Sequence, residues 1–393
     1  MTRLDFSSDC SKGSGFQLRW NGQHWDGGEL APFNHANTLV LLFGDLPRFT
    51  DAIDALRETL PLARLVGCTT AGEISALGTS DGPLIATLIG FDSVRLHLVT
   101  AEVDDRKASY QAGQRLALAL DSEGLRYIMI ISEGVTVNGS ELTKGLCDTH
   151  PTIPITGGLA GDGECFKETS VLANERLASH LVVAIGFYGE RLRVGYGSRG
   201  GWTPFGPVRT VTAADGNVLK ELDHESALTV YRRYLGELGC DLPAAGLRYP
   251  LEIQEANKPT TVVRTLLAID EHSGSITFAG DIPQGASVRM MRANAESLIE
   301  GASQAASVCQ QGEASQPEVI ILISCVGRRL LLRQLADDEI DQVVEVLGKQ
   351  AQVCGYYSYG EIAPFELGNC AELHNQTMTV TALSEAPPHA SSS

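Results

Sequence analysis

Long apolar runs separated by helical stretches dominate the pattern of hydrophobic and polar positions along this chain. The runs at 38–43, 127–132 and 319–324 are apolar at nearly every position, which is typical of strands buried on both faces of a sheet. A helical stretch follows each run, as at 49–60, where Pro61 marks the end. This alternation predicts an α/β protein in which helices pack on the faces of its sheets.

The same small-residue motif closes each of these strand-and-helix stretches. It covers 67–74, 156–162 and 355–362 and contains the pairs Gly72-Glu73, Gly161-Asp162 and Gly360-Glu361. Glycine before an acid is typical of a tight turn, so each pair taken alone fits turn chemistry. Three matched copies predict repeated units of strand, helix, Gly-rich turn and further strands.

A break in regular structure divides the chain near its middle. Residues 200–207 contain two prolines and several glycines around Trp202. We therefore predict two closely packed domains of mixed β-sheets with helices on their faces, at 37–205 and 206–383. Residues 1–36 are expected to form an N-terminal extension and 384–393 a disordered tail. The runs at 84–91 and 94–99 are expected to pair as strands.

The composition limits the partners that the chain can attract. With 393 residues, 43% of them hydrophobic, the chain can bury two or three cores. Its formal net charge of −18 repels nucleic acid and anionic lipid, so neither a nucleic acid nor a membrane is expected as a partner. Residues 1–9 do not resemble a signal peptide, and no run reaches the roughly 20 apolar residues of a membrane span, so we expect a cytoplasmic protein.

Aromatic and polar residues gather at 354–364 and 370–378. Tyrosines, a carboxylate, an imidazole and amides together are typical of a small-molecule pocket. His374 fits either a hydrogen-bonded structural histidine or a ligand to haem iron or a metal. The predicted ligand-binding residues are Tyr357, Tyr359, Glu361 and Asn375, with Glu73 and Asp162 from the earlier motifs.

Enzyme chemistry has fewer signals in this sequence. The GxSxG, HExxH and GxxxxGK[ST] motifs are absent, and the nine cysteines lack zinc-like spacing, so no metal site is expected. Glu73, Asp162 or Glu361 would act as acid or base only with a second titratable group within hydrogen-bond reach in one cleft.

Several of these segments together resemble the FIST family, named for F-box and intracellular signal transduction proteins. The resemblance is carried by 67–74, 201–207, 323–328, 355–364 and 372–378 and extends over about 35–385. It implies a ligand-sensing role in signal transduction without catalytic turnover. Small molecules such as amino acids are the ligands that it implies.

A narrower resemblance concerns the free-standing FIST proteins of the NosP type, which bind haem, sense nitric oxide and act on a histidine kinase. It implies haem as cofactor, His374 as its axial ligand and a separate signalling protein such as a histidine kinase as partner. Three hypotheses stay open here: a sensor of a small ligand with or without haem, an enzyme that uses Glu73, Asp162 or Glu361, and a scaffold that binds only protein.

Overall fold

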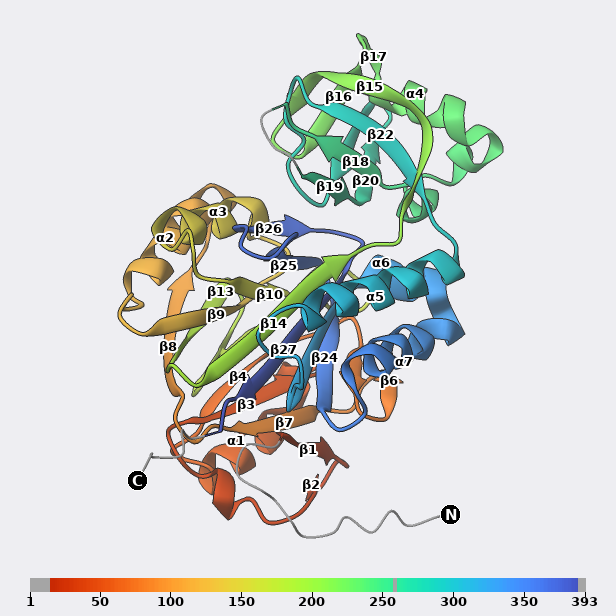
Figure 1. Ribbon diagram of the computed structural model, residues 1–393. Coiled ribbons are helices and arrows are strands. Elements are labelled where there is room, and N and C mark those ends of the chain that lie inside the picture. The colour runs from red at the N-terminus through yellow and green to blue at the C-terminus, as the bar shows by residue number, and fades with distance from the viewer. Residues whose placement is uncertain (1–14, 257–259, 388–393) are drawn as a thin grey trace.

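The apolar runs predicted as buried strands lie at the centres of three sheets. A computed structural model describes residues 15–256 and 260–387 (Figure 1). In it, β3 (Thr38–Phe43), β9 (Leu125–Ser132) and β23 (Val319–Cys325) each have a parallel strand on one side and an antiparallel strand on the other. The predicted α/β fold with mixed sheets is confirmed.

The three sheets share one strand order, which confirms the repeated unit. The first runs β12-β11-β4-β3-β7-β1-β2, the second β26-β25-β10-β9-β13-β8 and the third β6-β5-β24-β23-β27-β14. The remaining strands of these sheets are β1 (Gly15–Trp20), β2 (Trp25–Asp26), β4 (Arg64–Cys68), β5 (Glu73–Ser75), β6 (Gly78–Ser80), β7 (Ile85–Gly90), β8 (Arg95–Glu102), β10 (Ile155–Leu159), β11 (Val171–Ala173), β12 (Arg176–Ala178), β13 (Leu181–Tyr188), β14 (Leu192–Arg199), β24 (Gln352–Ser358), β25 (Gly360–Pro364), β26 (Ala371–His374) and β27 (Met378–Glu385).

Each unit passes one hairpin to a neighbouring sheet. After its Gly-rich motif, the first unit adds β5 to the third sheet, the second unit adds β11 to the first sheet and the third unit adds β25 to the second sheet. This cyclic exchange gives the three sheets a threefold arrangement around a shared apolar core. The three Gly-rich motifs are therefore the places where the chain crosses between sheets.

One glycine of each motif has the same steric cause. A Cβ atom at Gly67, Gly157 or Gly355 would overlap the carbonyl oxygen of the adjacent central strand. Since side chains of any size would push the two parallel strands apart, these positions need glycine for close approach of two backbones.

Helices cover the outer faces of the sheets. In α1 (Thr50–Thr59), Ala52, Ile53 and Leu56 are spaced so that one apolar face packs on the first sheet. The second unit carries α2 (Ser109–Leu118) and α3 (Gly139–Thr149), and the third carries α5 (Ala295–Gln310), α6 (Val326–Leu332) and α7 (Ala336–Leu347). Short 3-10 turns are η1 (Ala31–Phe33), η2 (Leu46–Phe49), η3 (Arg106–Ala108) and η6 (Arg333–Leu335).

A second, smaller part interrupts the third unit between β14 and α5, and we call it the insert. Figure 1 shows it in green and cyan at the top, joined to the three-sheet body by two segments. Its own core packs a fourth sheet against α4 (Ala227–Leu235). The insert contains β15 (Thr203–Asp215), β16 (Val218–Leu222), β17 (Glu225–Ser226), η4 (Gly236–Asp241), η5 (Ala244–Arg248), β18 (Leu251–Gln254), β19 (Thr261–Arg264), β20 (Leu266–Asp270), β21 (Ser275–Phe278) and β22 (Ser287–Arg292).

The predicted boundaries can be placed on this architecture. The division at 205 and 206 falls in β15, and the segment 206–383 covers both the insert and the return of the chain into the body. Within the predicted extension, 15–36 include β1, which pairs with β7, while 1–14 lie outside the described residues. Within the predicted tail, Ser384 and Glu385 belong to β27, and 388–393 are not described.

The strands β7 and β8 follow one another in the sequence but belong to different sheets. The predicted pairing of 84–91 with 94–99 is wrong, because β7 pairs with β1 and β3 whereas β8 pairs with β13 of another sheet.

Cys147 and Cys370, 223 residues apart, form a disulfide between α3 and the chain just before β26. Among the described helices, none is long and apolar enough to cross a membrane.

Candidate functional site

The three Gly-rich motifs meet at one end of the body. Gly161 N–H donates to Thr69 O at 3.0 Å, Ala71 N–H to Tyr357 O at 2.8 Å, and Tyr359 N–H to Leu159 O at 3.4 Å. Each motif is thus tied by backbone hydrogen bonds to another. The structure therefore brings together the motifs that lie far apart in the sequence.

The carboxylates of these motifs do not occupy equivalent places. Glu73 lies opposite Tyr356 and Glu361 lies opposite Gly158, but the corresponding position in the second unit holds Val171, opposite Cys68. Asp162 instead lies in a longer loop, 160–170, that precedes β11. The sequence match of Gly161-Asp162 with the other two pairs is therefore wrong in register.

Glu73 and Glu361 are enclosed, and each has its own hydroxyl partners. Glu73 accepts from Thr70 at 2.8 Å, and Glu361 accepts from Ser358 at 2.5 Å and from Thr377 Oγ1 at 3.1 Å. Burial raises the pKa of Glu73 to about 7 and that of Glu361 to about 8. The two carboxyl groups therefore change their protonation state near neutral pH although they lie in the core.

Tyr357 belongs to a buried ionic network. Its hydroxyl donates to Glu339 at 2.9 Å, and Arg328 donates to the other Glu339 oxygen at 2.8 Å. Both charged side chains are 0% exposed. Arg328 also donates to Gly200 O at 2.6 Å, in the segment that leads from the body into the insert. Tyr357 is thus linked through Glu339 and Arg328 to the connection with the insert.

Asp162 and Tyr359 order a loop closer to the surface. Asp162 accepts backbone N–H bonds from Phe166 and its next two neighbours at 2.7–2.9 Å and is bonded by the Tyr359 hydroxyl. Burial acts to raise its pKa, but these hydrogen bonds prevail and lower it. The Tyr359 ring stacks on Phe166 with centroids 4.3 Å apart. The carboxylate of Asp162 is therefore occupied in holding this loop.

His374 lies in a polar, tightly packed place on β26. Its ring is 1% exposed, and Nε2 lies 2.9 Å from Ala363 O. Burial lowers the pKa of His374 to about 4, so the ring is neutral. Haem requires a wide apolar slot beside a ring nitrogen that can reach iron. In this structure the residues around His374, which include charged Arg264 and Glu372, do not fit a haem.

Gln376 lies where the body meets the insert, and Asn375 precedes it in the body. Asn375 Nδ2 donates to Tyr359 O at 3.3 Å, and Gln376 Nε2 donates to Leu247 O of the insert at 3.2 Å. Because a carbonyl can only accept, these bonds fix both amide orientations. The remaining amide oxygens are buried without a hydrogen-bond partner in the part of the chain that the structure describes. Contact of these two residues, or of the tyrosines and carboxylates above, with a ligand stays a prediction.

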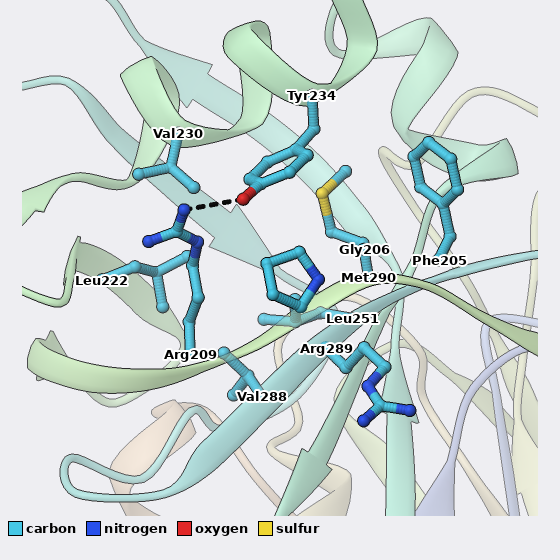
Figure 2. Close-up of a pocket in the computed structure, with 11 residues that line it drawn as sticks. Phe205, Gly206, Arg209, Leu222, Val230, Tyr234, Leu251, Val288, Arg289 and Met290 are labelled. Carbon is cyan, nitrogen blue, oxygen red and sulfur yellow. Dashed lines mark hydrogen bonds between the residues drawn. The ribbon is translucent and has the colours of Figure 1, made fainter.

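A hollow that the sequence did not predict lies in the insert. Between the pairs Phe205–Met290 and Arg209–Val288, three residues of β15 oppose the single residue Arg289 of β22. We call 206–208 the bulge; Gly206 has φ +86°, which glycine adopts without strain. Figure 2 shows the hollow between the bulge and α4.

The hollow has an apolar floor and a charged rim. Its floor consists of buried Leu222, Val230, Leu251, Val288 and Met290. At the rim, Arg209 donates to Tyr234 OH at 2.7 Å, the bond dashed in Figure 2, and to Asp223 at 2.9 Å. These partners outweigh burial and raise the pKa of Arg209, so the guanidinium stays charged. In the sequence this place is marked by Gly206-Pro207, two residues before Arg209. The sequence analysis above predicts only a domain boundary there.

The family models match this chain in two consecutive segments. The FIST N domain model matches 38–225, and the FIST C domain model matches 227–364. The chain belongs to the FIST family. FIST domains are generally sensor domains of signal transduction, so this FIST protein has a sensing role in signalling.

Individual known proteins match this chain with low sequence identity. An uncharacterised protein of Methanocaldococcus jannaschii is 23% identical over 373 residues, which cover 83% of this chain and 70% of that protein. A cyanuric acid hydrolase described as an innovation by structural concatenation matches with 8% identity and TM-score 0.33, over 96% of this chain and all of the hydrolase. The cyanuric acid hydrolase from A. caulinodans matches with 10% identity and TM-score 0.31, over 88% and 90%.

The expectation that this FIST protein has no catalytic turnover needs correction. The two solved structures named above are those of enzymes, and membership in a family of sensors is no ground for denying catalysis. At these TM-scores the match assigns neither a reaction nor catalytic residues to the chain. Glu73, Asp162 and Glu361 each have separate hydrogen-bond partners, as described above.

Proposed function

We propose that this FIST protein senses a small ligand in the hollow of the insert and reports it through the connection between insert and body. The hollow itself carries the proposal, because it combines a buried apolar floor with a fixed cationic rim. Its enclosed space is about 10 Å³, room for about one water molecule, so a ligand enters only when the bulge moves outward. A small number of convergent polar groups above an apolar lining is typical of small-molecule sites.

The position of the bulge supports the reporting step. It lies near the start of β15, only a few residues after Gly200 and Trp202. Arg328 holds Gly200 O, and Trp202 Nε1 donates to Gln376 O at 2.8 Å. A ligand that pushes the bulge outward would therefore pull on a segment anchored to the body. Such a ligand shifts the arrangement of the two parts only if it binds one arrangement more tightly.

Calorimetric titration of the full chain with small metabolites, amino acids among them, tests the proposal. Val230→Phe fills the hollow from α4, and Val208→Ala is the matched control because Val208 is 53% exposed at the tip of the bulge. We expect a ligand that binds the native protein to be lost in V230F and kept in V208A. A ligand that binds V230F unchanged would place the site elsewhere.

Haem, nitric oxide and a histidine kinase partner stay predictions from the resemblance to NosP-type proteins. The absorption spectrum of the purified protein after haem loading tests them directly. A Soret band that disappears in His374→Ala would support that version, and it would require the packing around His374 to open. An unchanged spectrum after loading would leave a sensor without haem.

A further inference from the structure

We propose that Cys147 and Cys370 form a thiol–disulfide switch that controls how firmly the insert is held on the body. Oxidation of the pair fixes the insert, and reduction loosens it. The reductant is a small thiol of the glutathione type, and the response is separate from ligand binding in the hollow.

The disulfide joins two elements of the body that are both bonded to the insert. Figure 1 shows α3 and β26 side by side at the end of the body that faces the insert. Cys147 lies near the end of α3, and Cys370 directly precedes β26. Asn138, the N-cap of α3, donates to both carboxylate oxygens of Asp281 in the insert, at 3.1 and 3.2 Å. The cross-link therefore sets the spacing between α3 and β26 where the insert rests.

Arg264 of the insert depends on this spacing. Its Nη1 donates to the carbonyl oxygen of Leu373 on β26 at 2.8 Å, and its Nη2 donates to Ser140 of α3 at 3.4 Å. The side chain is 5% exposed, so a lost bond is not replaced by water. A shift of β26 relative to α3 would leave a buried cation short of acceptors, which is unfavourable.

Few other contacts hold the start of β26. It is the edge strand of the second sheet and pairs with β25 alone among the described strands. Residues 366–369 in the loop before it are exposed. Without the cross-link, this end of the strand is held by β25, by the packing of Ala371 and Leu373 and by the insert itself. Such an edge opens more readily than a central strand.

The other cysteines of the described residues are free. Four of these six are buried, and burial raises the pKa of Cys309 and Cys354 to about 12, so they stay unreactive thiols. Cys165 and Cys240 are exposed and unpaired in the described part of the chain. Reducing compartments keep such thiols free, and a disulfide that forms there is usually transient or redox-sensing.

Exchange with small thiols is the chemistry of the switch. A small thiolate attacks Sγ of Cys370, the more exposed of the pair; the S–S bond breaks, a mixed disulfide forms, and Cys147 leaves as a thiolate that takes up a proton. A second small thiolate attacks the mixed disulfide and releases Cys370. The pair thus gains two electrons and two protons, and the two small thiols leave as their own disulfide. Cys147 Sγ lies 3.5 Å from Ala371 O, so the reduced thiol has an acceptor in place.

The test equilibrates the full chain with mixtures of reduced and oxidised glutathione. Alkylation and peptide mass spectrometry then identify the free thiols, and hydrogen exchange reports on the junction. We expect Cys147 and Cys370 to be reduced together as the share of reduced glutathione rises. Amide exchange at 138–141 and 261–264 should become about tenfold faster in the reduced protein.

Two variants show whether this pair is responsible. Cys147→Ser combined with Cys370→Ser should exchange fast in every mixture. Cys165→Ser is the matched control, since it removes an exposed thiol outside the pair and should respond as the native protein does. Redox-dependent exchange that persists in the double variant would assign the response to another cysteine and overturn the proposal.

The native protein alone gives the remaining answers, even where the double variant fails to fold. A pair that stays oxidised in a large excess of reduced glutathione would be a fixed cross-link and no switch. A pair that stays reduced in a large excess of oxidised glutathione would equally overturn the proposal. Reduction of the pair with unchanged exchange at 138–141 and 261–264 would show that it does not control the insert.

Discussion

The body and the insert of this protein differ in what their polar residues do. In the body, Glu361, Tyr357 and Asp162 come from repeated motifs, yet each is bonded to other protein groups where the sheets exchange strands. In the insert, Arg209 comes from no repeated motif, yet it faces a hollow with part of its donor capacity unused. The repeated motifs are therefore explained by the exchange of strands between the three sheets. The hollow has another cause, the bulge in one sheet of the insert.

The largest effect is expected in the body, where Arg328 connects the network around Tyr357 to the insert. Arg328→Met leaves the Glu339 carboxylate buried without its cation, which costs about 3–5 kcal/mol of unfolding free energy. Urea unfolding measures this loss. The control is Arg126→Met, which removes an exposed pair with Glu313 and should cost about 0.2–1 kcal/mol. Similar losses in the two variants would contradict the distinction between a buried network and surface charges.

The body should also respond to pH through Glu361. Its pKa is about 8 in the folded state against an ordinary value of 4.5, so folding favours the protonated form. The stabilisation is complete below about pH 4.5 and is lost as pH rises through about 8, with a slope of up to about 1.4 kcal/mol per pH unit. Glu73, with a pKa of about 7, adds to the same trend.

Denaturant unfolding between pH 5 and 9 measures this slope. Glu361→Gln keeps the shape of the protonated acid and should flatten the curve, whereas Glu385→Gln, a change at a carboxylate bonded at the surface to Ser93, should not. A native protein whose stability is constant over this range would show that Glu361 is ionised in the core.

A substitution at the connection between the body and the insert is expected to have an intermediate effect on the unfolding free energy. Trp202→Phe removes the hydrogen bond to Gln376 O, which is worth about 0.5–1.5 kcal/mol. Trp25→Phe is a matched control, because it removes a similar bond to Ala52 O at 2.9 Å within the first unit. Limited proteolysis near residues 199–206 should become faster in W202F alone. Equal cleavage in both variants would mean that Trp202 does not anchor the insert.

The smallest effect is expected at the bulge. Val208→Ala should change the unfolding free energy by no more than about 0.5 kcal/mol, since the side chain is exposed. Val288→Ala on the floor of the hollow removes two buried methyl groups, at about 0.8 kcal/mol each. Thermal unfolding of the two variants compares them. Equal losses would show that the bulge is packed as firmly as the floor.

The central strands, the repeated unit and the family could all be predicted from the order of residues along the chain. Runs such as 319–324 are apolar because they are buried on both faces, and this cause acts on consecutive residues. The glycines at 67, 157 and 355 could be found for a similar reason, because a close contact between two strands leaves its mark on a single position. A small-molecule pocket around Tyr357 stays a prediction, and the bond of the Tyr357 hydroxyl to Glu339 could not be foreseen because the two residues come from different elements.

The sheet that each strand joins, and the place where the hollow forms, depend on contacts between residues that are far apart in the sequence. The runs at 84–91 and 94–99 are neighbours in sequence but belong to different sheets, since hairpins pass between units. Val171, and not Asp162, lies opposite Cys68, because the loop at 160–170 places Asp162 before β11. The hollow beside Arg209 depends on three residues of β15 opposing one of β22, and pairing between distant strands is a property of no single stretch of sequence.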